Sequence, residues 1–329
     1  MTSPQDHASG SLAETGEWAL LAALHRRLPQ GEDVLLGPGD DAALVTAPDG
    51  RVVVTVDVLV EGVHFRRDWA SADDIGARAA AASLADVAAM GARPTALVVG
   101  LAAPGDLDTA WTLRLADGMR DEAASVGASL VGGDVTSSPH LVVSVTALGD
   151  LAGRAPVTRA GARPGDVVAV AGRLGWSAAG LAVLQRGFGS PRALVDAYRR
   201  PRPPYAAGPA AAQAGATSMC DVSDGLLSDL GHVARASQVD IDLHRERFEV
   251  AEPLQALAAA YQRKVWPWVL GGGEDHALVA SFPTGTSLPD GFTVIGEVRA
   301  AQEREGRVTP TVTVDGRTVP GPAGHEHFR

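Results

Sequence analysis

Residues 52–65 read VVVTVDVLVEGVHF, and this stretch decides the fold. It begins with a run of β-branched residues, which is typical of a buried strand. We expect the strand to end at Thr55 and Asp57, where a carboxylate first appears, and residues 61–64 to form a loop. In α/β proteins, ligands bind where buried strands end in polar loops. The stretch therefore predicts an α/β fold with a polar site at the end of a strand.

Other acids occupy comparable positions, because each follows an apolar run or a glycine-rich turn. They are Asp40 and Asp41 after GPG, Asp134 after LVGG, Asp221 and Asp224 in MCDVSDG, and Glu274 and Asp275 after LGGG. Carboxylate oxygens are hard ligands that suit Mg²⁺, an ion that also accepts water and substrate phosphates as ligands. We expect these acids to converge on several Mg²⁺ ions, and the ions to hold phosphates.

Each acid also has a purely structural interpretation. Asp40 and Asp41 suit a turn, Asp224 is placed to cap a helix predicted over residues 225–236, and Asp134 suits a loop. For any one of them the structural interpretation is at least as good as the functional one. Their recurrence after strands and glycine-rich turns favours the joint interpretation.

Composition limits the class of protein. The chain has 329 residues, enough for two domains, and 46% of them are hydrophobic. No apolar run reaches the roughly 18 residues of a membrane span, and the first 16 residues lack an apolar signal core. Cys220 is the single cysteine, which excludes an internal disulfide, and its strand position predicts a buried thiol rather than a nucleophile. A cytoplasmic location follows as the expectation.

The net charge and the scarcity of lysine further limit which partners and phosphate-binding motifs are possible. The net charge of −11 makes nucleic acid and anionic membrane unlikely partners. Lys264 is the only lysine, and the chain has no G-x-x-x-x-G-K-[ST] loop. A bound nucleotide would therefore be met by metal ions and arginine. Arg159, in the TRAGARPGD turn, is a candidate phosphate fork, although it could equally be an ordinary surface arginine.

Hydrophobic periodicity predicts two α/β domains with mixed sheets. We expect a flexible tail over residues 1–15, an N-terminal domain over 16–152 and a C-terminal domain over 153–329, because residues 153–165 are rich in Gly, Pro and Arg. Helices are predicted over residues 17–28, 72–90, 107–126 and 225–236. Strands are predicted over residues 95–101, 128–131, 141–148, 166–171, 216–220, 239–243, 276–282, 292–298 and 308–314. The arginine- and proline-rich residues 192–204 are expected to be an exposed connection.

Asp86 falls on the apolar side of the helix predicted over residues 72–90. It follows Ile75 by eleven residues, which at 3.6 residues per turn is about 20° from the same direction. A buried carboxylate is costly unless it is protonated, paired or bound to a metal. Asp86 is therefore a candidate metal ligand, with an ion pair to Arg93 as the alternative.

Together these motifs resemble those of the thiamine-monophosphate kinases, within the aminoimidazole-ribonucleotide synthetase-like superfamily. The matching segments cover nearly the whole chain, from Gly37 to Phe328. They are GPGDDAAL, TVDVLVEGVHF, SLADVAAMGARP, LVGGDVT, TRAGARPGD, CDVSDGLLSDLGH, LGGGEDHAL and the closing HEHF. VEGVHF, ADVAAMGA and GGEDHAL are specific to the family only in combination.

The resemblance implies direct transfer of the ATP γ-phosphate to the phosphate of thiamine monophosphate, giving thiamine diphosphate. It implies two α/β domains and a homodimer formed through N-terminal strands. It assigns Mg²⁺ ligands at Asp41, Thr55, Val56, Asp57, Asp86, Asp134, Asp221 and Asp224. It assigns the nucleotide to Gly133, Asp134, Arg159 and Ser223, and the thiamine side to His64, Glu274 and His325. Asp57, Asp134 and Arg159 are the expected catalytic groups.

Three positions depart from the family pattern. Leu115 stands where relatives often have an aromatic residue near adenine, and His325 stands where an aromatic residue precedes the closing HF. Val56 replaces a hydroxyl residue, so only its carbonyl could bind a metal. Two other functions stay open: another ATP-using synthetase of the superfamily, and a non-catalytic protein that binds a nucleotide or divalent cation.

Overall fold

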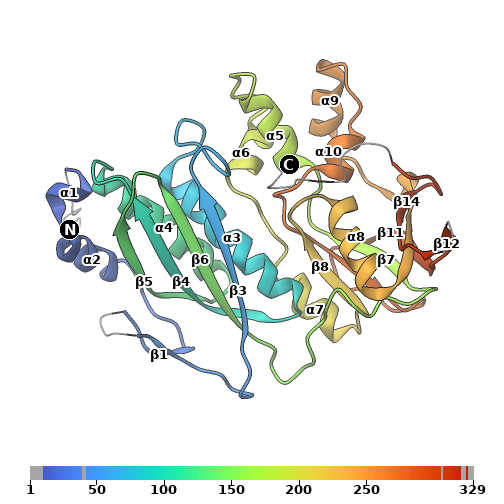
Figure 1. Cartoon of the computed structure of the whole chain (residues 1–329), viewed down its shortest axis with the longest axis horizontal. Coiled ribbons are helices and arrows are strands. Elements are labelled where there is room, and N and C mark those ends of the chain that lie inside the picture. The colour runs from blue at the N-terminus through green and yellow to red at the C-terminus, as the bar shows by residue number, and fades with distance from the viewer. Residues whose placement is uncertain (1–9, 39–41, 305–306, 320–323, 325–329) are drawn as a thin grey trace. The chain divides into compact units, whose positions relative to one another are not determined.

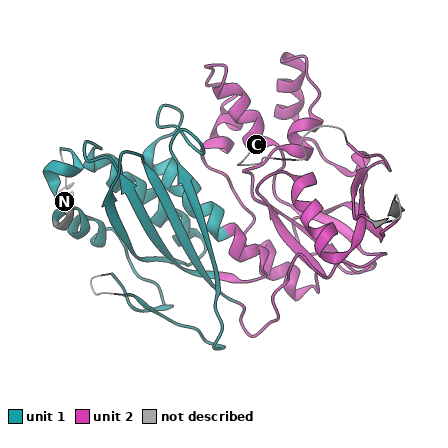
Figure 2. Ribbon diagram, in the orientation of Figure 1, with its two compact units in different colours: residues 1–84, 94–150 teal, residues 85–93, 151–329 magenta. Residues whose placement is uncertain are grey.

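The computed structural model describes residues 10–38, 42–304, 307–319 and 324. Contacts divide the chain into two compact units, coloured separately in Figure 2. Unit 1 comprises Met1–Leu84 and Pro94–Asp150, and unit 2 comprises Ala85–Arg93 and Leu151–Arg329. The domain division at residues 152 and 153 stays a proposal.

Unit 1 is built on a four-stranded sheet in the order β3-β6-β4-β5 (Figure 1). β3 and β6 are antiparallel, and β4 and β5 are parallel, so the sheet is mixed as predicted. The elements up to residue 150 are α1 (Leu12–Thr15), α2 (Glu17–His25), β1 (Val34–Leu36), β2 (Leu44–Val45), β3 (Val53–Val60), α3 (Ala72–Ala89), β4 (Arg93–Ala103), α4 (Thr109–Ser125), β5 (Ser129–Ser137) and β6 (Val142–Asp150).

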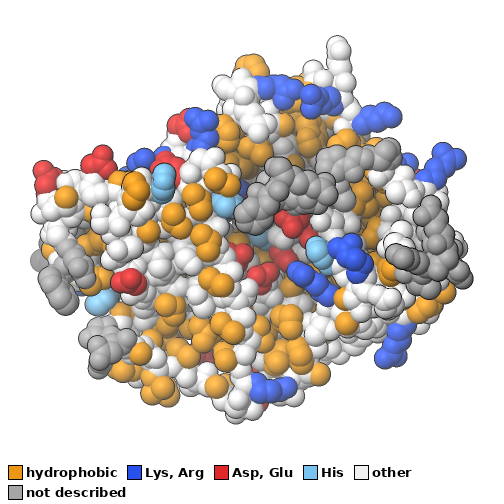
Figure 3. All heavy atoms as spheres, viewed as in Figure 1, with side chains coloured by type: hydrophobic (Ala, Val, Ile, Leu, Met, Phe, Trp, Pro, Cys, Tyr) orange, Lys and Arg blue, Asp and Glu red, His pale blue; other side chains and the backbone are white. Residues whose placement is uncertain are grey.

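Strand β3 differs from its prediction. It does not end at Asp57 but continues to Val60, because it pairs with β6 from Val53 to Val60, and its side chains alternate between the two faces of the sheet. β3 lies at the edge of the sheet. Val54, Val56 and Val58 are 64%, 57% and 48% exposed on one face. Apolar side chains gather over this sheet in Figure 3. The run of valines is therefore an open apolar face rather than a buried strand.

The other face of the sheet carries α3 and α4, which approach each other closely. A Cβ atom at Gly76 would lie 2.0 Å from the carbonyl oxygen of Leu115, and one at Gly118 would lie 2.1 Å from the carbonyl oxygen of Asp73. Only glycine allows this distance between the two helices. The close packing fixes α4, and with it Leu115, against the sheet.

The predicted N-terminal tail is partly wrong. Residues 1–9 lie outside the described residues, but α1 is an ordered helix. Ser11 caps it through a capping box with Glu14, and the Leu12 N–H donates a 2.8 Å bond to the carbonyl of Leu107. The Ser-x-x-Glu spacing of residues 11–14 is the local signal for a helix start, and the polar composition of the segment drew attention away from it.

Unit 2 is built on a six-stranded sheet in the order β14-β9-β11-β7-β10-β8. All its neighbouring strands are antiparallel except β14 and β9, and apolar clusters cover both faces. Its elements are β7 (Val167–Ala171), α5 (Trp176–Leu184), α6 (Arg192–Arg199), α7 (Ala207–Gln213), β8 (Ser218–Val222), α8 (Leu226–Ser237), β9 (Val239–Leu243), η1 (Arg245–Arg247), α9 (Glu252–Ala260), α10 (Trp266–Gly271), β10 (Ala277–Phe282), β11 (Phe292–Ala300), β12 (Glu303–Arg304), β13 (Arg307–Val308) and β14 (Val312–Val314).

The exposed connection predicted over residues 192–204 is wrong for its first half. Helix α6 occupies Arg192–Arg199 and buries Leu194, Val195 and Tyr198. Leu194 and Tyr198 are four residues apart, so they lie on one side of the helix. Arg192 is exposed and Arg199 is half-buried, and the charged residues at the ends of the helix hid this pattern. Among the described residues, no helix is both long and apolar enough to cross a membrane.

Candidate active site

In unit 1, Asp57 lies on the helix-covered face of β3. The Ser83 hydroxyl, fully buried on α3, is 2.8 Å from Asp57 Oδ2 and 2.9 Å from the Val145 carbonyl oxygen. Thr55 shares this face with Asp57, and the Val56 side chain points to the opposite, open face. The contact with Ser83 fixes the Asp57 carboxylate toward α3.

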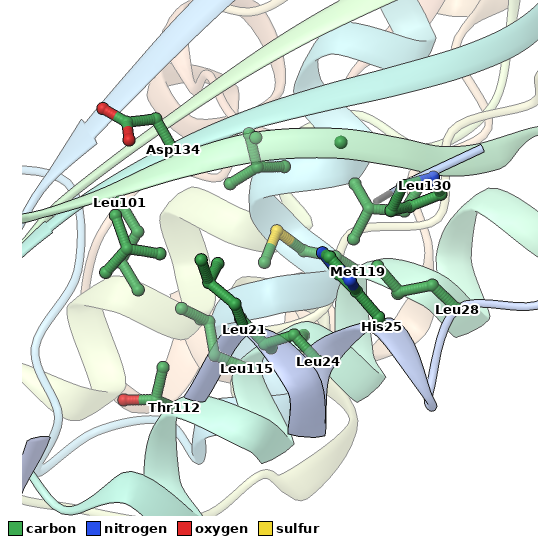
Figure 4. Close-up of a pocket in the computed structure, with 16 residues that line it drawn as sticks. Leu21, Leu24, His25, Leu28, Leu101, Thr112, Leu115, Met119, Leu130 and Asp134 are labelled. Carbon is green, nitrogen blue, oxygen red and sulfur yellow. The ribbon is translucent and has the colours of Figure 1, made fainter. Parts of the chain in front are cut away.

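Asp134 lies inside β5, which continues to Ser137 instead of ending at Val131 as predicted. Residues paired across neighbouring strands point to the same face, and the partner of Asp134 on β4 is Gly100. A Cβ at Gly100 would contact the side chain of Ser144 on β6. Ser144 is in turn the partner of Val58, whose side chain is on the open face. Figure 4 likewise shows the Asp134 carboxylate on the side of β5 away from the helices. Asp134 and Asp57 therefore lie on opposite faces of the sheet.

A small apolar cavity of about 70 Å³ lies on the helix side of β5 (Figure 4). Leu115 and Met119 of α4, Leu21 and Leu24 of α2, and Leu28 just after α2 contribute to its lining. Gly133 lines it too, and a Cβ there would lie 2.1 Å from the Val99 carbonyl oxygen, so the position requires glycine. Sequence reasoning missed the role of α2 because no local pattern reports which sheet a helix covers.

His64 is held by its own loop. The Val60 N–H donates a 3.0 Å bond to His64 Nδ1, and the His64 N–H donates a 2.9 Å bond to the Val60 carbonyl. Nδ1 is therefore the acceptor nitrogen of the ring, and the ring proton is on Nε2. In the same loop, Glu61 forms a 2.6 Å ion pair with Arg67. These contacts give the VEGVHF segment a defined shape.

In unit 2, Asp221 lies within β8 and pairs with His276. Both are buried, at 3% and 4% exposure, and Asp221 Oδ2 is 3.1 Å from His276 Nδ1. The adjacent thiol of Cys220 is buried as predicted. Burial raises the pKa of Cys220 well above its ordinary value, which opposes a role as nucleophile.

Asp224 does not cap α8, contrary to the alternative considered for it. Helix α8 begins after Gly225 without a side-chain cap, and Asp229 reaches back instead. Asp229 Oδ2 accepts bonds of 3.1 Å from the backbone N–H groups of both Asp224 and Gly225. Burial, followed by the charge of Asp221, raises the pKa of Asp229 to about 7. Asp229 is a structural acid that sequence reasoning missed, and it fixes the loop that carries Ser223 and Asp224.

The structure brings Ser223 and Glu274 together. The Glu274 N–H donates a 2.8 Å bond to the Ser223 carbonyl oxygen. A Cβ at Gly273 would lie 2.1 Å from that same oxygen, so glycine is required for this contact. The two loops assigned to nucleotide and thiamine therefore lie side by side.

Arg159 has an exposed side chain and an anchored backbone. The Ser237 hydroxyl donates a 3.0 Å bond to the Arg159 carbonyl oxygen. Burial lowers the pKa of His232 on α8, and the charges of Arg235 and Arg159 lower it further. Arg159 therefore adds positive charge near α8.

The remaining predicted ligands are not tested by these contacts. Asp86 is half-buried in the last turn of α3. Asp41 and His325 lie outside the described residues. Within the described part of the chain, no group of three or more His, Cys, Asp or Glu residues is arranged to hold a metal ion. The Mg²⁺ ligand set therefore stays a prediction.

Comparison with known proteins identifies the family. Residues 39–151 match the family model described as AIR synthase related protein, N-terminal domain, and residues 163–308 match the corresponding C-terminal domain. The thiamine-monophosphate kinase of Mycobacterium tuberculosis is 49% identical, covering 98% of this chain and 96% of the relative.

Two solved structures have the same fold. The crystal structure of thiamine-monophosphate kinase from Stenotrophomonas maltophilia K279a has a TM-score of 0.79 and 32% identity, covering 92% of this chain and 98% of that one. AaThiL complexed with AMPPCP and TMP has a TM-score of 0.77 and 28% identity, covering 96% of this chain and 98% of that one. On the full-length identity of the curated relative, this chain belongs to the thiamine-monophosphate kinase family.

Proposed function

We propose that this chain transfers the γ-phosphate of ATP to thiamine monophosphate, producing thiamine diphosphate and ADP. The observation that carries the proposal is 49% identity to a thiamine-monophosphate kinase over nearly the full length of both chains. The solved structure with AMPPCP and TMP, at 28% identity, supports the same pair of substrates.

An ADP-release assay across several acceptors tests the proposal. We expect rapid ADP formation with thiamine monophosphate, and little with thiamine or hydroxymethylpyrimidine phosphate. Nucleotide binding without ADP formation would favour the non-catalytic binding protein. ADP formation with none of these acceptors, but with an amide or selenide substrate, would favour another synthetase of the superfamily.

For the nucleotide, we propose contacts from Gly133, Asp134, Arg159 and Ser223. The apolar cavity beside Gly133 supports this assignment, because one of its walls is Leu115, the position linked to adenine. Aliphatic side chains can contact both faces of a purine but provide no ring for stacking. Arg159, whose backbone is anchored by Ser237, would pair with phosphate oxygens.

For the acceptor, we propose contacts from His64, Glu274 and His325. Glu274 carries a negative charge suited to the cationic thiazolium ring of thiamine. The phosphate of the acceptor is already ionised near neutral pH, so the reaction needs no strong general base. The protein contributes mainly alignment of the two phosphates and cancellation of their charge. Asp57, Asp134 and Arg159 are the proposed catalytic groups.

We propose Mg²⁺ as the cofactor, because the donor set consists of hard oxygen atoms. When bound, the ions would neutralise phosphate charge that a chain with one lysine cannot neutralise alone. The proposed ligands are Asp41, Thr55, the Val56 carbonyl, Asp57, Asp86, Asp134, Asp221 and Asp224. Asp134 requires a further assumption: since its carboxylate is on the open face of the sheet, the end of β5 would have to twist for Asp134 to join Asp57.

We also propose that the chain forms a homodimer through the open face of the N-terminal sheet. Val54, Val56 and Val58 expose a continuous apolar row on the edge strand β3. Such a row on an edge strand is usually protected by charge or covered by a partner. A second copy of the chain is the occupant that the family resemblance indicates. Analytical ultracentrifugation tests this, and a monomer at micromolar concentration would contradict it.

A further inference from the structure

Asp275, the neighbour of Glu274, has a position that none of the proposed roles explains. Its side chain is buried, with 4% exposure. Its Oδ1 accepts a 2.9 Å bond from the backbone N–H of Ser177, 98 residues away, and its buried Oδ2 has no hydrogen-bond partner among the described residues. This donor belongs to the first turn of α5, where the backbone N–H groups of a helix have no acceptor within the helix. Asp275 is therefore the cap of a distant helix.

Helix α5 depends on this remote cap. Its N-cap residue is Gly175, in the left-handed conformation with φ +80°, and Gly175 has no side chain to accept a bond. Asp, Asn, Ser or Thr at the N-cap usually supplies that acceptor. The link between α5 and Asp275 therefore also fixes the position of the segment that contains Asp275.

The residues on both sides of Asp275 have unusual backbone conformations. Glu274 has φ +67° and His276 has φ +50°. Residues other than glycine seldom adopt these values and keep them only where the surroundings impose them. On the β8 side, the Glu274 N–H bonds to the Ser223 carbonyl at 2.8 Å and the His276 N–H bonds to the Val222 carbonyl at 3.1 Å. On the α5 side, the cap is the restraint.

We propose that Asp275 is a positioning residue for the phosphoryl acceptor, because it clamps residues 274–276 between β8 and α5 and thereby holds Glu274 in its left-handed conformation. Relaxation of Glu274 to an ordinary negative φ would rotate its backbone by about 130° and redirect its side chain. The inference rests on the proposed function, in which Glu274 contacts the thiamine side.

Steady-state kinetics of Asp275→Ala and Asp275→Asn test the clamp. We expect Asp275→Ala to raise KM for thiamine monophosphate about tenfold or more, and to change KM for ATP less than about threefold. Asp275→Asn is expected to restore the acceptor KM to within about threefold of wild type, because its carbonyl oxygen can still accept the Ser177 N–H. A folded Asp275→Ala variant with an unchanged acceptor KM would overturn the proposal.

Asp166→Asn is the matched control. Asp166 is also buried in unit 2, but it lies at the other end of β7 from Gly175, and its Oδ2 accepts bonds from the Arg163 N–H and the Thr217 hydroxyl. We expect this variant to lower the unfolding midpoint and to leave both KM values unchanged. If KM for thiamine monophosphate rises similarly in the control, the rise in Asp275→Ala is due to general destabilisation, and the clamp is overturned.

A double-mutant cycle tests whether Asp275 acts through Glu274. In a Glu274→Gln background, Asp275→Ala is expected to change the acceptor KM less than about twofold, since the route through Glu274 is already lost. Two effects that multiply would show that Asp275 acts independently, against the proposal. If Asp275→Ala does not fold, Asp275→Ser replaces it in the cycle.

A crystal structure of Asp275→Ala separates this inference from the proposed function. If wild type makes no thiamine diphosphate, the proposed function fails, but the clamp still predicts that Glu274 leaves φ +67° in the variant. Retention of that conformation would overturn the clamp even in an active enzyme.

Discussion

The acidic side chains of unit 1 and unit 2 have different surroundings. In unit 1, Asp57 and Asp134 are on opposite faces of a sheet whose one face is open and lined with valines. In unit 2, Asp229 is buried and accepts bonds from the backbone of the loop that carries Ser223 and Asp224, and Asp275, next to Glu274, is buried and accepts a bond from the backbone of α5. The loops of unit 2 are thus organised by the chain itself. The acids of unit 1, by contrast, are those proposed above to bind metal ions and nucleotide.

The largest loss of activity is expected for substitution of Asp57, the acid of unit 1 that is proposed to hold Mg²⁺. Asp57→Asn keeps the shape and the contact with the Ser83 hydroxyl but removes the charge proposed to hold Mg²⁺. We expect kcat/KM to fall about a hundredfold or more, or about 3 kcal/mol of transition-state stabilisation. Asp68→Asn, an exposed acid paired with Arg66, is the control and should retain activity. Near-normal turnover of Asp57→Asn at modest Mg²⁺ would contradict the proposed role.

The open face of unit 1 should respond to a single charge. Val56→Asp places a carboxylate in the middle of the exposed row on β3, and in a symmetric dimer the substitution occurs twice. Because each buried valine contributes about 1.5–3 kcal/mol, we expect self-association to weaken at least tenfold. Sedimentation equilibrium measures this. An unchanged dimer would mean that the valine row serves another purpose.

In unit 2, alanine substitution should lower the unfolding free energy at Asp229 but not at Asp224. Asp229→Ala leaves two buried N–H groups without their acceptor, which we expect to cost about 1–3 kcal/mol of unfolding free energy. Asp224→Ala removes no helix cap and should change stability by less than about 0.5 kcal/mol. Urea unfolding of the two variants without Mg²⁺ makes the comparison. Equal losses would show that Asp229 is not the organising acid.

The last prediction is a pH dependence of the stability of unit 2. Burial raises the pKa of Asp275 from 3.8 to about 7, so the folded chain binds this proton more tightly than the unfolded chain. The contribution to stability is therefore greatest below pH 4 and is lost as pH rises toward 7. Asp275→Asn lacks this loss, and its stability relative to wild type should improve between pH 5 and pH 8. If the difference in unfolding midpoint between variant and wild type is the same at pH 5 and at pH 8, the raised pKa of Asp275 is contradicted.

Sequence patterns predicted most of the elements, because strands and helices here carry regular hydrophobic spacing. The errors have physical causes. In β3, Val54 and Val56 alternate with Thr55 and Asp57, and an edge strand with an open face was mistaken for a buried strand that ends at an acid. In unit 2, the charged residues of α6 and the prolines that follow it concealed a buried stripe of Leu194, Val195 and Tyr198.

The site was less predictable than the fold. The motifs indicated Asp221, Ser223 and Glu274, and the structure places Ser223 and Glu274 on adjacent loops. The roles of Asp229 and Asp275 depend on which backbone N–H groups they reach, which no local pattern reveals. Asp229, in the first turn of α8, carried a weak signal, since acids favour helix starts. Asp275 caps a helix 98 residues away and carried none.

Phosphorus NMR of the purified protein with ATP, Mg²⁺ and thiamine monophosphate tests the central claim most directly. We predict that thiamine diphosphate and ADP form together in equal amounts, without free phosphate, and that wild type does this while Asp57→Asn does not. Hydrolysis of ATP to ADP and free phosphate with thiamine monophosphate unchanged, or no reaction at all, would contradict the account.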